Sequence, residues 1–529
     1  LMATIQGLAT ENEALRTRVS GLEKLNSWYE QQFKLMKKKQ FGTSSEQAQY
    51  NGIEEQYCLF NDVEAEYKPF QPEPTEETVI PEHKRKKGKR GESFEDLPVV
   101  QIEYTLPKED QLCPQCGEPL HVMKKEIRKE IHVIPARLEI VEHVTNFYTC
   151  RNCEKTGITT PVIAAPSPRA LIPRSMVSPS MMAHLMNQKY SCGLPLYRME
   201  QDFMRMGLNL SRQNMSNWII AGAGLLGALG KKLKEELLEN EVLMADETPI
   251  QVLHEPEKTP QSKSYMWVYR TGAYAKHPVI QFDYRVGRSG EFAKNYLKGF
   301  KGKLTVDGYV GYEKLENVTL CGCWAHCKRY FDDALVPIPA KDRTPDLPEA
   351  KGLTYCEKLF AIEKAATKEK LSAEARLKLR KAESKPVIEE FYQWVDIQEN
   401  KTLPQSLLGK ALTYAKNQKT KLLGFLNDGR VELSNNASER SVKSFVIGRK
   451  AWLFCDTQAG ASASAMVYGI IQTAIENRLK PYAYLNYVFE TIQSDGSDST
   501  EKLLPWSEHI PEACRMSAKE IERYEKKKH

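Results

Sequence analysis

The stretch Val242-Leu-Met-Ala-Asp-Glu-Thr-Pro-Ile-Gln-Val252 is the most informative part of the chain, because an acid, Asp246, stands inside a predicted apolar strand. A buried carboxylate costs free energy unless it is paired or bound to a metal ion. Two further strands, Tyr265–Arg270 and Val279–Tyr284, follow as hairpin partners. The stretch therefore predicts a strand in which the carboxylate of Asp246 is either paired or bound to a metal ion.

The next segment alternates strands with helices. It predicts a short helix over Phe292–Leu297, strands over Lys303–Val306 and Val318–Cys323, and a helix from Ala325. Three strands in hairpin order, followed by strand–helix–strand, predict a mixed α/β sheet.

Two more carboxylates lie where they could do chemistry. Asp307 ends the predicted strand Lys303–Val306, and Gly308 permits a turn behind it. Glu439 lies on a helix that starts near Ser434. Such hard oxygen ligands suit Mg²⁺ or Mn²⁺, and two of these ions can promote phosphoryl transfer. Cations that follow Glu439 are candidate phosphate contacts: Arg440, Lys443, Arg449 and Lys450.

Each acid also has an ordinary interpretation. Asp307 and Gly308 could form a plain turn, Glu439 could pair with Lys443 on one helix face, and Asp246 could be a strand-end acid. Taken together, their order along the chain (an aspartate on the first strand, one at the end of the fourth strand, and a glutamate on a late helix) favours a shared chemical site.

Two cysteine pairs, Cys113-Pro-Gln-Cys116 and Cys150-Arg-Asn-Cys153, are separated by 33 residues. Each pair aims two thiolates at one point, so the four predict a closed, structural Zn²⁺ site. The segments Ile127–Ile134 and Leu138–Tyr148 between them alternate in hydropathy and predict strands.

A second group of possible metal ligands, Cys321, Cys323, His326 and Cys327, lies at a strand-to-helix junction. A second zinc is conceivable there. Because side chains so close along this junction would not all converge, we expect instead that His326 is an active-site neighbour, against the alternative of a packed core histidine.

Between the cysteines and the first strand, the pattern is helical. A first helix runs through Met186 to Tyr190, and a second ends before Gly207. A third helix begins at Ser211 and carries Arg212. Helix, glycine turn and helix can form a DNA-reading helix-turn-helix, although most helical pairs do not bind DNA. A basic run that could neutralise phosphates, or be a solvated tether, precedes the cysteines: Lys84, Arg85, Lys86, Lys87, Lys89 and Arg90.

The first forty residues carry a heptad repeat. One core position holds Leu8, Leu15, Leu22, Tyr29 and Met36, and the other holds Ile5, Asn12, Val19, Asn26 and Phe33. This pattern predicts a dimerising coiled coil over residues 1–40, or a single amphipathic helix that lies on the rest of the protein.

Composition limits the class of protein. The chain has 529 residues, a net charge of +6 and 41% hydrophobic residues, and its apolar stretches are too short to cross a membrane. Twelve cysteines with this spacing do not form a disulfide framework. We therefore expect a cytoplasmic protein without a membrane span.

Several motifs together resemble the insertion-sequence-66 (IS66) family of bacterial transposases. They are Ala245-Asp-Glu-Thr-Pro249, Val306-Asp-Gly-Tyr309, Gly322-Cys-Trp-Ala-His326, Asn435-Asn436 with Glu439-Arg440, Gly448-Arg-Lys450, Leu194-Pro-Leu-Tyr197 and Leu503-Leu-Pro-Trp506. Three positions depart from the family pattern, namely Ser434, Lys443-Ser444 and Ala451. None of these touches the three acids, although the lysine at 443 could weaken a phosphate contact.

The resemblance implies an RNase H-like core with a DDE triad of Asp246, Asp307 and Glu439. In such transposases the triad binds two Mg²⁺ ions, cuts the element's ends and joins the freed 3′-hydroxyls to target DNA. The implied partners are double-stranded DNA with terminal inverted repeats, target DNA, and accessory proteins of the same element, and no membrane. The implied location is the bacterial cytoplasm, at the nucleoid when the protein binds DNA. Two alternatives remain, a non-catalytic zinc-dependent DNA-binding protein and an RNase H-like nuclease without strand transfer.

The expected architecture is a multidomain α+β chain. It comprises a coiled coil (1–45), a linker with the basic run (46–97), a zinc-binding β module (98–165), a helical DNA-binding segment (166–240), an α/β catalytic core (241–490) with a helical insertion at about 340–430, and a tail (491–529).

Overall fold

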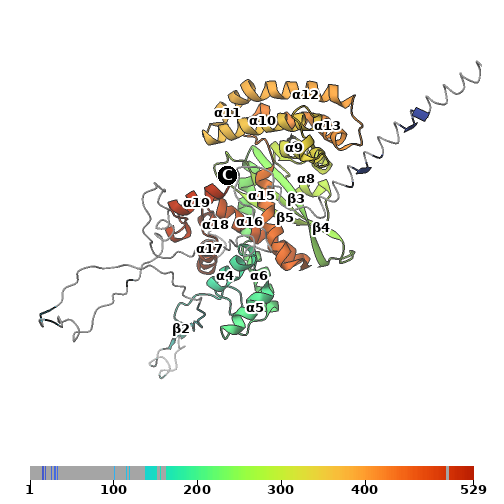
Figure 1. The fold of residues 1–529 in the computed structure, drawn as a ribbon. Coiled ribbons are helices and arrows are strands. Elements are labelled where there is room, and N and C mark those ends of the chain that lie inside the picture. The colour runs from blue at the N-terminus through green and yellow to red at the C-terminus, as the bar shows by residue number, and fades with distance from the viewer. Residues whose placement is uncertain are drawn as a thin grey trace, which may run out of the picture. The chain divides into compact units, whose positions relative to one another are not determined.

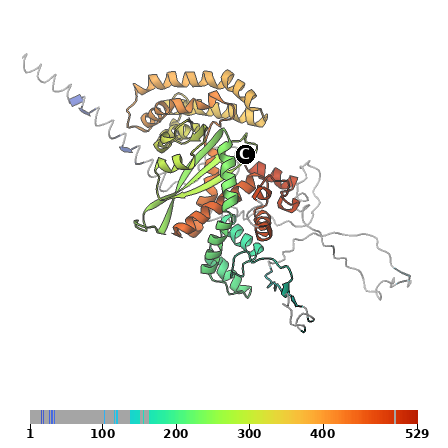
Figure 2. The ribbon, with the colours of Figure 1, turned by 180° about the vertical axis from the view of Figure 1, so that it is seen from behind.

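The computed structural model describes residues 137–149, 162–495 and 500–528, and a few separate positions before residue 156. The chain divides into two compact units, one of residues 1–42 with 140–529 and one of residues 43–139. Figures 1 and 2 show the first unit from opposite sides, and its elements are described here.

A mixed sheet forms the middle of this unit. Its strands lie in the order β5-β4-β3-β6-β7, and the chain forms them as β3 (Val242–His254), β4 (Lys263–Thr271), β5 (Ile280–Arg285), β6 (Gly302–Val306) and β7 (Val318–Gly322). The first three strands pair antiparallel, whereas β6 runs parallel to both β3 and β7. Each strand lies within two residues of its predicted bounds, so the mixed α/β sheet is confirmed.

The central strand β3 is long enough to pair with two partners on one edge. Its first residues pair with β6, and its far end pairs with a short parallel strand, β8 (Cys455–Thr457), at Val252 and His254. Residues 242–245 of β3 are all buried, as expected for a strand covered on both faces. Asp246 follows directly on this buried run.

Helices enclose the sheet. Those of the sheet domain are α8 (Gly290–Tyr296), a 3₁₀ turn η2 (Val310–Lys314), α9 (Trp324–Leu335), α15 (Asn436–Trp452) and α16 (Gln458–Glu476). α15 packs against β3 and β4, and α16 packs against β5. The aromatic contact between Phe282 of β5 and Phe445 of α15 belongs to this interface.

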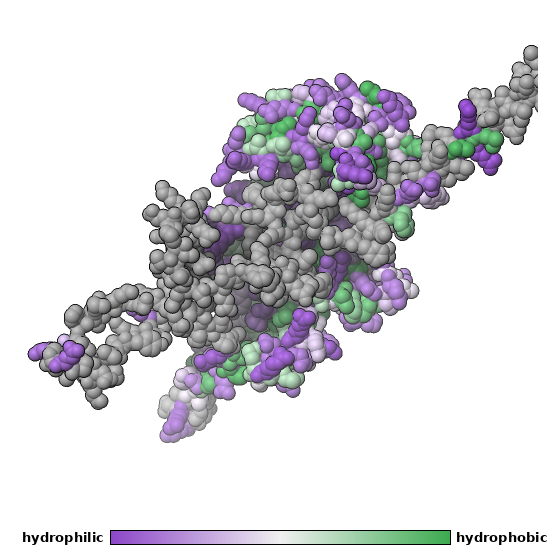
Figure 3. All heavy atoms as spheres, in the orientation of Figure 1, coloured by the Kyte–Doolittle hydropathy of each residue, from purple (hydrophilic) through white to green (hydrophobic). Residues whose placement is uncertain are grey.

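The predicted helical insertion is confirmed as helical. It consists of α10 (Pro348–Lys368), α11 (Ala373–Leu379), a π-helical turn (Arg380–Ser384), α12 (Lys385–Glu399), α13 (Leu407–Asn417) and α14 (Lys419–Leu422). It lies at the top of Figure 1 and shows a largely hydrophilic outer surface in Figure 3.

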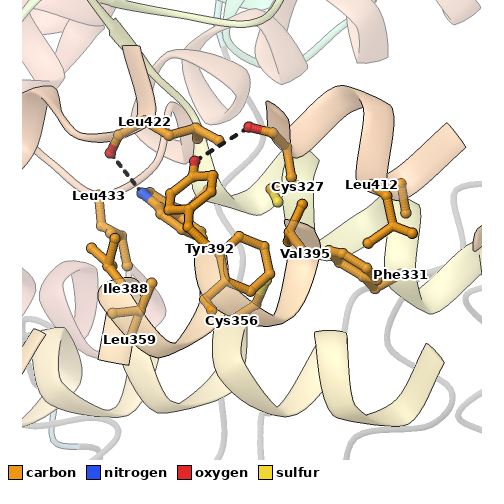
Figure 4. Close-up of a cluster of buried hydrophobic side chains, with 14 of the residues drawn as sticks. Cys327, Phe331, Cys356, Leu359, Ile388, Tyr392, Val395, Leu412, Leu422 and Leu433 are labelled. Carbon is orange, nitrogen blue, oxygen red and sulfur yellow. Dashed lines mark hydrogen bonds between the residues drawn. The ribbon is translucent and has the colours of Figure 1, made fainter. Parts of the chain in front are cut away.

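The insertion is tied to the sheet domain by one hydrophobic cluster, part of which Figure 4 shows. Cys327 and Phe331 of α9 are buried against Cys356 and Leu359 of α10 and against Val395 of α12. Two hydrogen bonds cross the cluster, from the Trp324 indole to the Leu422 carbonyl and from the Tyr392 hydroxyl to the Ala415 carbonyl. Because the core is shared, the insertion is not a loosely attached domain.

Four helices precede the sheet, α4 (Pro179–Tyr190), α5 (Leu196–Arg205), α6 (Arg212–Leu225) and α7 (Gly227–Glu239). α5 ends at a turn where Gly207 has φ +88°, a conformation that favours glycine. Ser211 then caps α6 by accepting a hydrogen bond from the Asn214 amide at 3.3 Å. The predicted helix, turn and helix are therefore present.

The C-terminal residues are more ordered than the predicted tail. Helices α17 (Pro481–Asp495), α18 (Thr500–Leu503) and α19 (Ala518–Lys528) and a 3₁₀ turn (Glu512–Cys514) occupy them. α17 packs on α4, and Tyr484 donates a hydrogen bond to the Leu503 carbonyl. The apolar Leu503 and Leu504 are buried here, which explains their place in an otherwise polar stretch.

One predicted strand is wrong for most of its length. Only Phe147–Thr149 forms a strand, β1, which pairs antiparallel with β2 (Val162–Ala164), whereas residues 137–146 have no regular structure. This stretch is largely exposed, so alternation in hydropathy has no core face to fill.

Separate described positions between 15 and 33 are helical, as the heptads predict. Among the helices that the structure describes, none is long and apolar enough to cross a membrane.

Candidate active site

The sheet register brings two of the three acids to one row. Residues 242, 243 and 244 of β3 pair with 303, 304 and 305 of the parallel strand β6. Continued for two residues, this register places Asp246 beside Asp307, which directly follows the end of β6. Neighbouring strands lie about 4.8 Å apart, so the two carboxylates share one end of the sheet.

Asp307 is held by a local turn. Its carboxylate accepts a hydrogen bond from the Tyr309 amide at 2.9 Å, as in an Asx turn. The Gly308–Tyr309 turn predicted from the sequence is therefore present. It leaves the Asp307 side chain half-buried at the end of the sheet.

Glu439 reaches the site from α15, and Asn435 at the start of that helix sets its position. The Asn435 side-chain amide donates to the Ala245 carbonyl at 2.8 Å, beside Asp246, and its backbone amide donates to the Cys323 sulfur at 3.1 Å. Asn435 is fully buried. These bonds fix the first turn of α15 against β3 and the β7–α9 junction.

A buried arginine holds the same helix from the other side. Arg270 of β4 donates hydrogen bonds to the Ala437 carbonyl and to the Ser441 hydroxyl, both at 2.9 Å. Glu476 of α16 lies 3.8 Å from this guanidinium and supplies a counter-charge. Glu439 lies between the two anchored residues of α15, so its main chain is fixed.

Asp307 and Glu439 both act electrostatically on Asp246. Burial raises the pKa of Asp246 to about 8, and the nearby carboxylates of Glu247, Glu439 and Asp307 also raise it. The opposing contribution is one hydrogen bond from the Glu247 amide at 2.8 Å. Within the described part of the chain, no ion pair involves Asp246 or Asp307. The described residues thus form a carboxylate cluster in which Arg288 acts on Asp307 only at longer range than an ion pair.

Glu247 has a different environment from Asp246. Arg288 binds one of its oxygens through two nitrogens at 2.8 and 2.6 Å, and Tyr312 donates to the other at 2.7 Å. Burial nevertheless raises the pKa of Glu247. Because both of its oxygens already have hydrogen-bond partners, we assign Glu247 a structural role next to the three acids.

Glu439 faces two residues of α9 and not Lys443. Its oxygens lie 3.9 Å from His326 Nδ1 and 3.8 Å from an Arg329 nitrogen. The interpretation of Glu439 as half of a helix-surface pair with Lys443 is thus not supported. The expectation that His326 is a neighbour of the acids agrees with this geometry.

The four cations that follow Glu439 lie in two different environments, one half-buried and one exposed. Arg449 donates hydrogen bonds to the Pro249 carbonyl and the Thr248 hydroxyl of β3, and it lines a cavity of about 400 Å³ with Lys263 and Leu453. Arg440, Lys443 and Lys450 are exposed on α15. Arg212 lies elsewhere, exposed at the start of α6. The six cations of residues 84–90 and all four paired cysteines (Cys113, Cys116, Cys150 and Cys153) lie outside the described residues.

Four family models match this chain. A model described as "Transposase IS66 family" matches residues 174–463, which is more than half of the chain and spans all three acids. The chain belongs to the IS66 family of transposases. A model of the zinc-finger binding domain of transposase IS66 matches residues 110–154, which contain the four paired cysteines. A transposase C homeodomain model matches residues 28–102, and the IS66 C-terminal element matches 470–506.

Relatives of this IS66 transposase family chain include uncharacterized proteins of Sinorhizobium fredii. Protein y4qI is 27% identical over 90% of this chain and 87% of its own length. Protein y4jD is 28% identical over 80% of this chain and 83% of its own length. These similarities extend along most of both chains, so the family relationship is not confined to one domain.

Three residues that lie against α15 of this IS66 protein were not predicted from the sequence to have a role there. Asn435 was part of a motif but had no assigned task, and Arg270 and Arg329 had none. An arginine inside the apolar strand Tyr265–Arg270 was a usable signal, because a buried charge requires partners. Nothing local in the sequence indicated that those partners would lie on α15.

Proposed function

We propose that this chain is a DDE-type DNA transposase that cuts element ends and joins their 3′-hydroxyls to target DNA. The observation that carries the proposal is the convergence of Asp246, Asp307 and Glu439 from β3, β6 and α15 in an IS66-family chain. The strand order β5-β4-β3-β6-β7, with its helical insertion before Glu439, supports an RNase H-like core.

The three acids fit divalent cations. Asp246 is desolvated next to other carboxylates, and the buried Glu439 Oε1 has no hydrogen-bond partner. Hard carboxylate oxygens of this kind match Mg²⁺ or Mn²⁺. When bound, such ions supply Lewis-acid stabilisation of the phosphate and lower the pKa of the attacking hydroxyl.

The chain's own residues then have distinct tasks. Asp246 and Asp307 provide two carboxyl groups on neighbouring strands of the sheet, and Glu439 adds a third from a separate helix. Arg270 and Asn435 hold that helix in place. We assign Arg440, Lys443 and Lys450 to DNA phosphates, because their exposed charges lie on the helix that carries Glu439.

The remaining assignments rest on the family and the sequence. We propose that Cys113, Cys116, Cys150 and Cys153 bind a structural Zn²⁺, and that Arg212 and the basic run at 84–90 contact double-stranded DNA. We also propose a dimer through residues 1–40 and a need for accessory proteins of the same element.

A joining assay tests the function. The purified full chain is incubated with Mg²⁺, a labelled DNA end carrying the element's inverted repeat, and plasmid target DNA. We expect labelled joined product. Cut ends without joining would support a nuclease instead, and binding without cleavage would support a non-catalytic DNA-binding protein. Accessory proteins of the element are added in a parallel reaction.

The raised pKa of Asp246 predicts a pH-dependent response to Mg²⁺. In the unfolded chain this acid titrates near 3.9, whereas in the folded chain its pKa is about 8. The folded state therefore binds more protons between these values, and the group's contribution to stability is lost as the pH rises from about 4 to about 8. A bound cation removes this penalty.

We thus expect Mg²⁺ to raise Tm more at about pH 8.5 than at about pH 6. Thermal unfolding with and without Mg²⁺ measures the difference. In Asp246→Asn the Mg²⁺-induced shift should become nearly independent of pH. An equal shift at both pH values in the unsubstituted chain would contradict the assignment.

A further inference from the structure

Three side chains of different chemistry converge beside the proposed carboxylate site. The ligand atoms of Cys323, His326 and Glu439 all lie within 4.8 Å of one another. Cys323 sits directly after β7, and His326 follows on the first turn of α9. The register that pairs Val306 with Gly322 also places Cys323 beside Asp307.

The sequence expectation for this region needs correction. The other two candidate ligands turn away, since Cys321 packs against Gly424 and Cys327 lies in the hydrophobic cluster with Cys356. Cys323 and His326 instead converge with a third residue, Glu439, from a distant part of the chain. Local spacing could not reveal that residue.

Burial raises the pKa of the Cys323 thiol to about 11, so a cation that binds its sulfur must displace a proton. Its sulfur accepts a hydrogen bond from the Asn435 amide at 3.1 Å, and backbone amides of α9 also act on it. Such bonds to a sulfur stabilise its metal-bound form. Cys323 is fully buried, but the side chains of His326 and Glu439 are 24% and 32% exposed and give access from solvent.

We infer that Cys323, His326 and Glu439 form a site for a thiophilic divalent cation, Zn²⁺ in the cell, that competes with catalysis for Glu439. A sulfur, a ring nitrogen and a carboxylate are a ligand set that zinc accepts, with ligand atoms about 3.3 to 3.8 Å apart in a tetrahedral site. His326 Nδ1 and a Glu439 oxygen are already 3.9 Å apart, and no two of the three ligand atoms are more than 4.8 Å apart, so small side-chain rotations reach this spacing. A cation held there binds the carboxylate that the proposed Mg²⁺ site also needs.

This consequence for activity rests on the proposed function, whereas cation binding itself does not. Zn²⁺ at Cys323 would inhibit the transposase by withdrawing Glu439. Hard Mg²⁺ has little preference for a thiol, so the site would distinguish the two ions by chemistry and not by charge.

Binding is tested with Co²⁺, added to the full chain whose cysteine-pair module already holds zinc. Thiolate-bound Co²⁺ gives a near-ultraviolet charge-transfer band, whereas Co²⁺ on the acids alone does not. We expect this band to saturate at one added equivalent, to disappear in Cys323→Ser, and to persist in Cys192→Ser, which removes an exposed thiol. An identical band in the chain and in Cys323→Ser would overturn the inference.

A second variant covers the case in which Cys323→Ser does not fold. His326→Asn alters a half-buried ligand, and we expect it to weaken Co²⁺ binding by about tenfold or more. Unchanged affinity would overturn the inference. In the joining assay, the Zn²⁺ concentration that halves activity should rise about tenfold in Cys323→Ser compared with the unsubstituted chain.

The two proposals can fail separately. A chain that joins DNA but shows no thiolate–Co²⁺ band retains its proposed function and loses this site. A chain that shows the Cys323-dependent band but neither cuts nor joins DNA retains the cation site and loses the proposed function.

Discussion

Asp246→Asn is expected to reduce Mg²⁺-dependent cleavage and joining by about 10³-fold or more, because a bound cation contributes several kcal/mol to stabilising the transition state. The amide keeps the shape of the side chain but lacks the charge that holds a cation. Binding to DNA, measured by fluorescence anisotropy, should stay within about twofold, because the proposed phosphate contacts are other residues.

The substitution should also leave the fold intact, because burial already favours the neutral form of Asp246. Asp396→Asn, on an exposed position of α12, is the matched control for loss of one carboxylate. It should leave cleavage and joining unchanged. If Asp246→Asn retained more than about a tenth of the activity, the three-acid site would not be the catalytic centre.

Glu363→Ala is expected to destabilise the chain by about 3–5 kcal/mol, because it leaves a buried charge without its partner. Arg380 is completely buried and binds both oxygens of Glu363, at 2.6 and 2.9 Å. It also donates to the carbonyls of Phe425 and Asp428, each at 2.9 Å. Those carbonyls cannot neutralise the guanidinium once Glu363 is removed.

Urea unfolding followed by tryptophan fluorescence measures the loss of unfolding free energy, since Trp324 and Trp394 lie in the hydrophobic cluster that joins the insertion to α9. Glu389→Ala is the control, because its pair with Lys385 spans 3.8 Å and both side chains are 60% exposed. It should cost less than about 1 kcal/mol. Replacing both buried partners by Glu363→Leu and Arg380→Met should cost less than Glu363→Ala alone. An equally small effect of Glu363→Ala and Glu389→Ala would contradict the prediction.

The buried pair also bears on the site through the chain segment that it holds. Lys303 of β6 binds the Asp428 carboxylate at 2.6 Å, and β6 leads directly to Asp307. The Arg380 network therefore connects the insertion to the strand that carries one of the three acids. We expect Glu363→Ala to lower activity through this strand as well as through stability.

Much of the sheet could be predicted because its signals are local. The strands around Asp246 and Asp307 carry apolar residues in short runs, and Gly308 marks the turn. The Leu138–Tyr148 strand failed for the opposite reason, since alternation without a core to cover does not make a strand.

The strands of the sheet, the helical nature of the insertion, the three candidate acids and, through several motifs, the family all followed from the sequence alone. Only the tertiary structure decided that Asp246 and Asp307 share one row, that Asn435 and Arg270 fix the helix of Glu439, and that Cys323 and His326 converge on that same carboxylate. Hydropathy periods report on neighbours a few residues apart. Strand register and helix docking depend on packing between segments nearly two hundred residues apart, which no local pattern encodes.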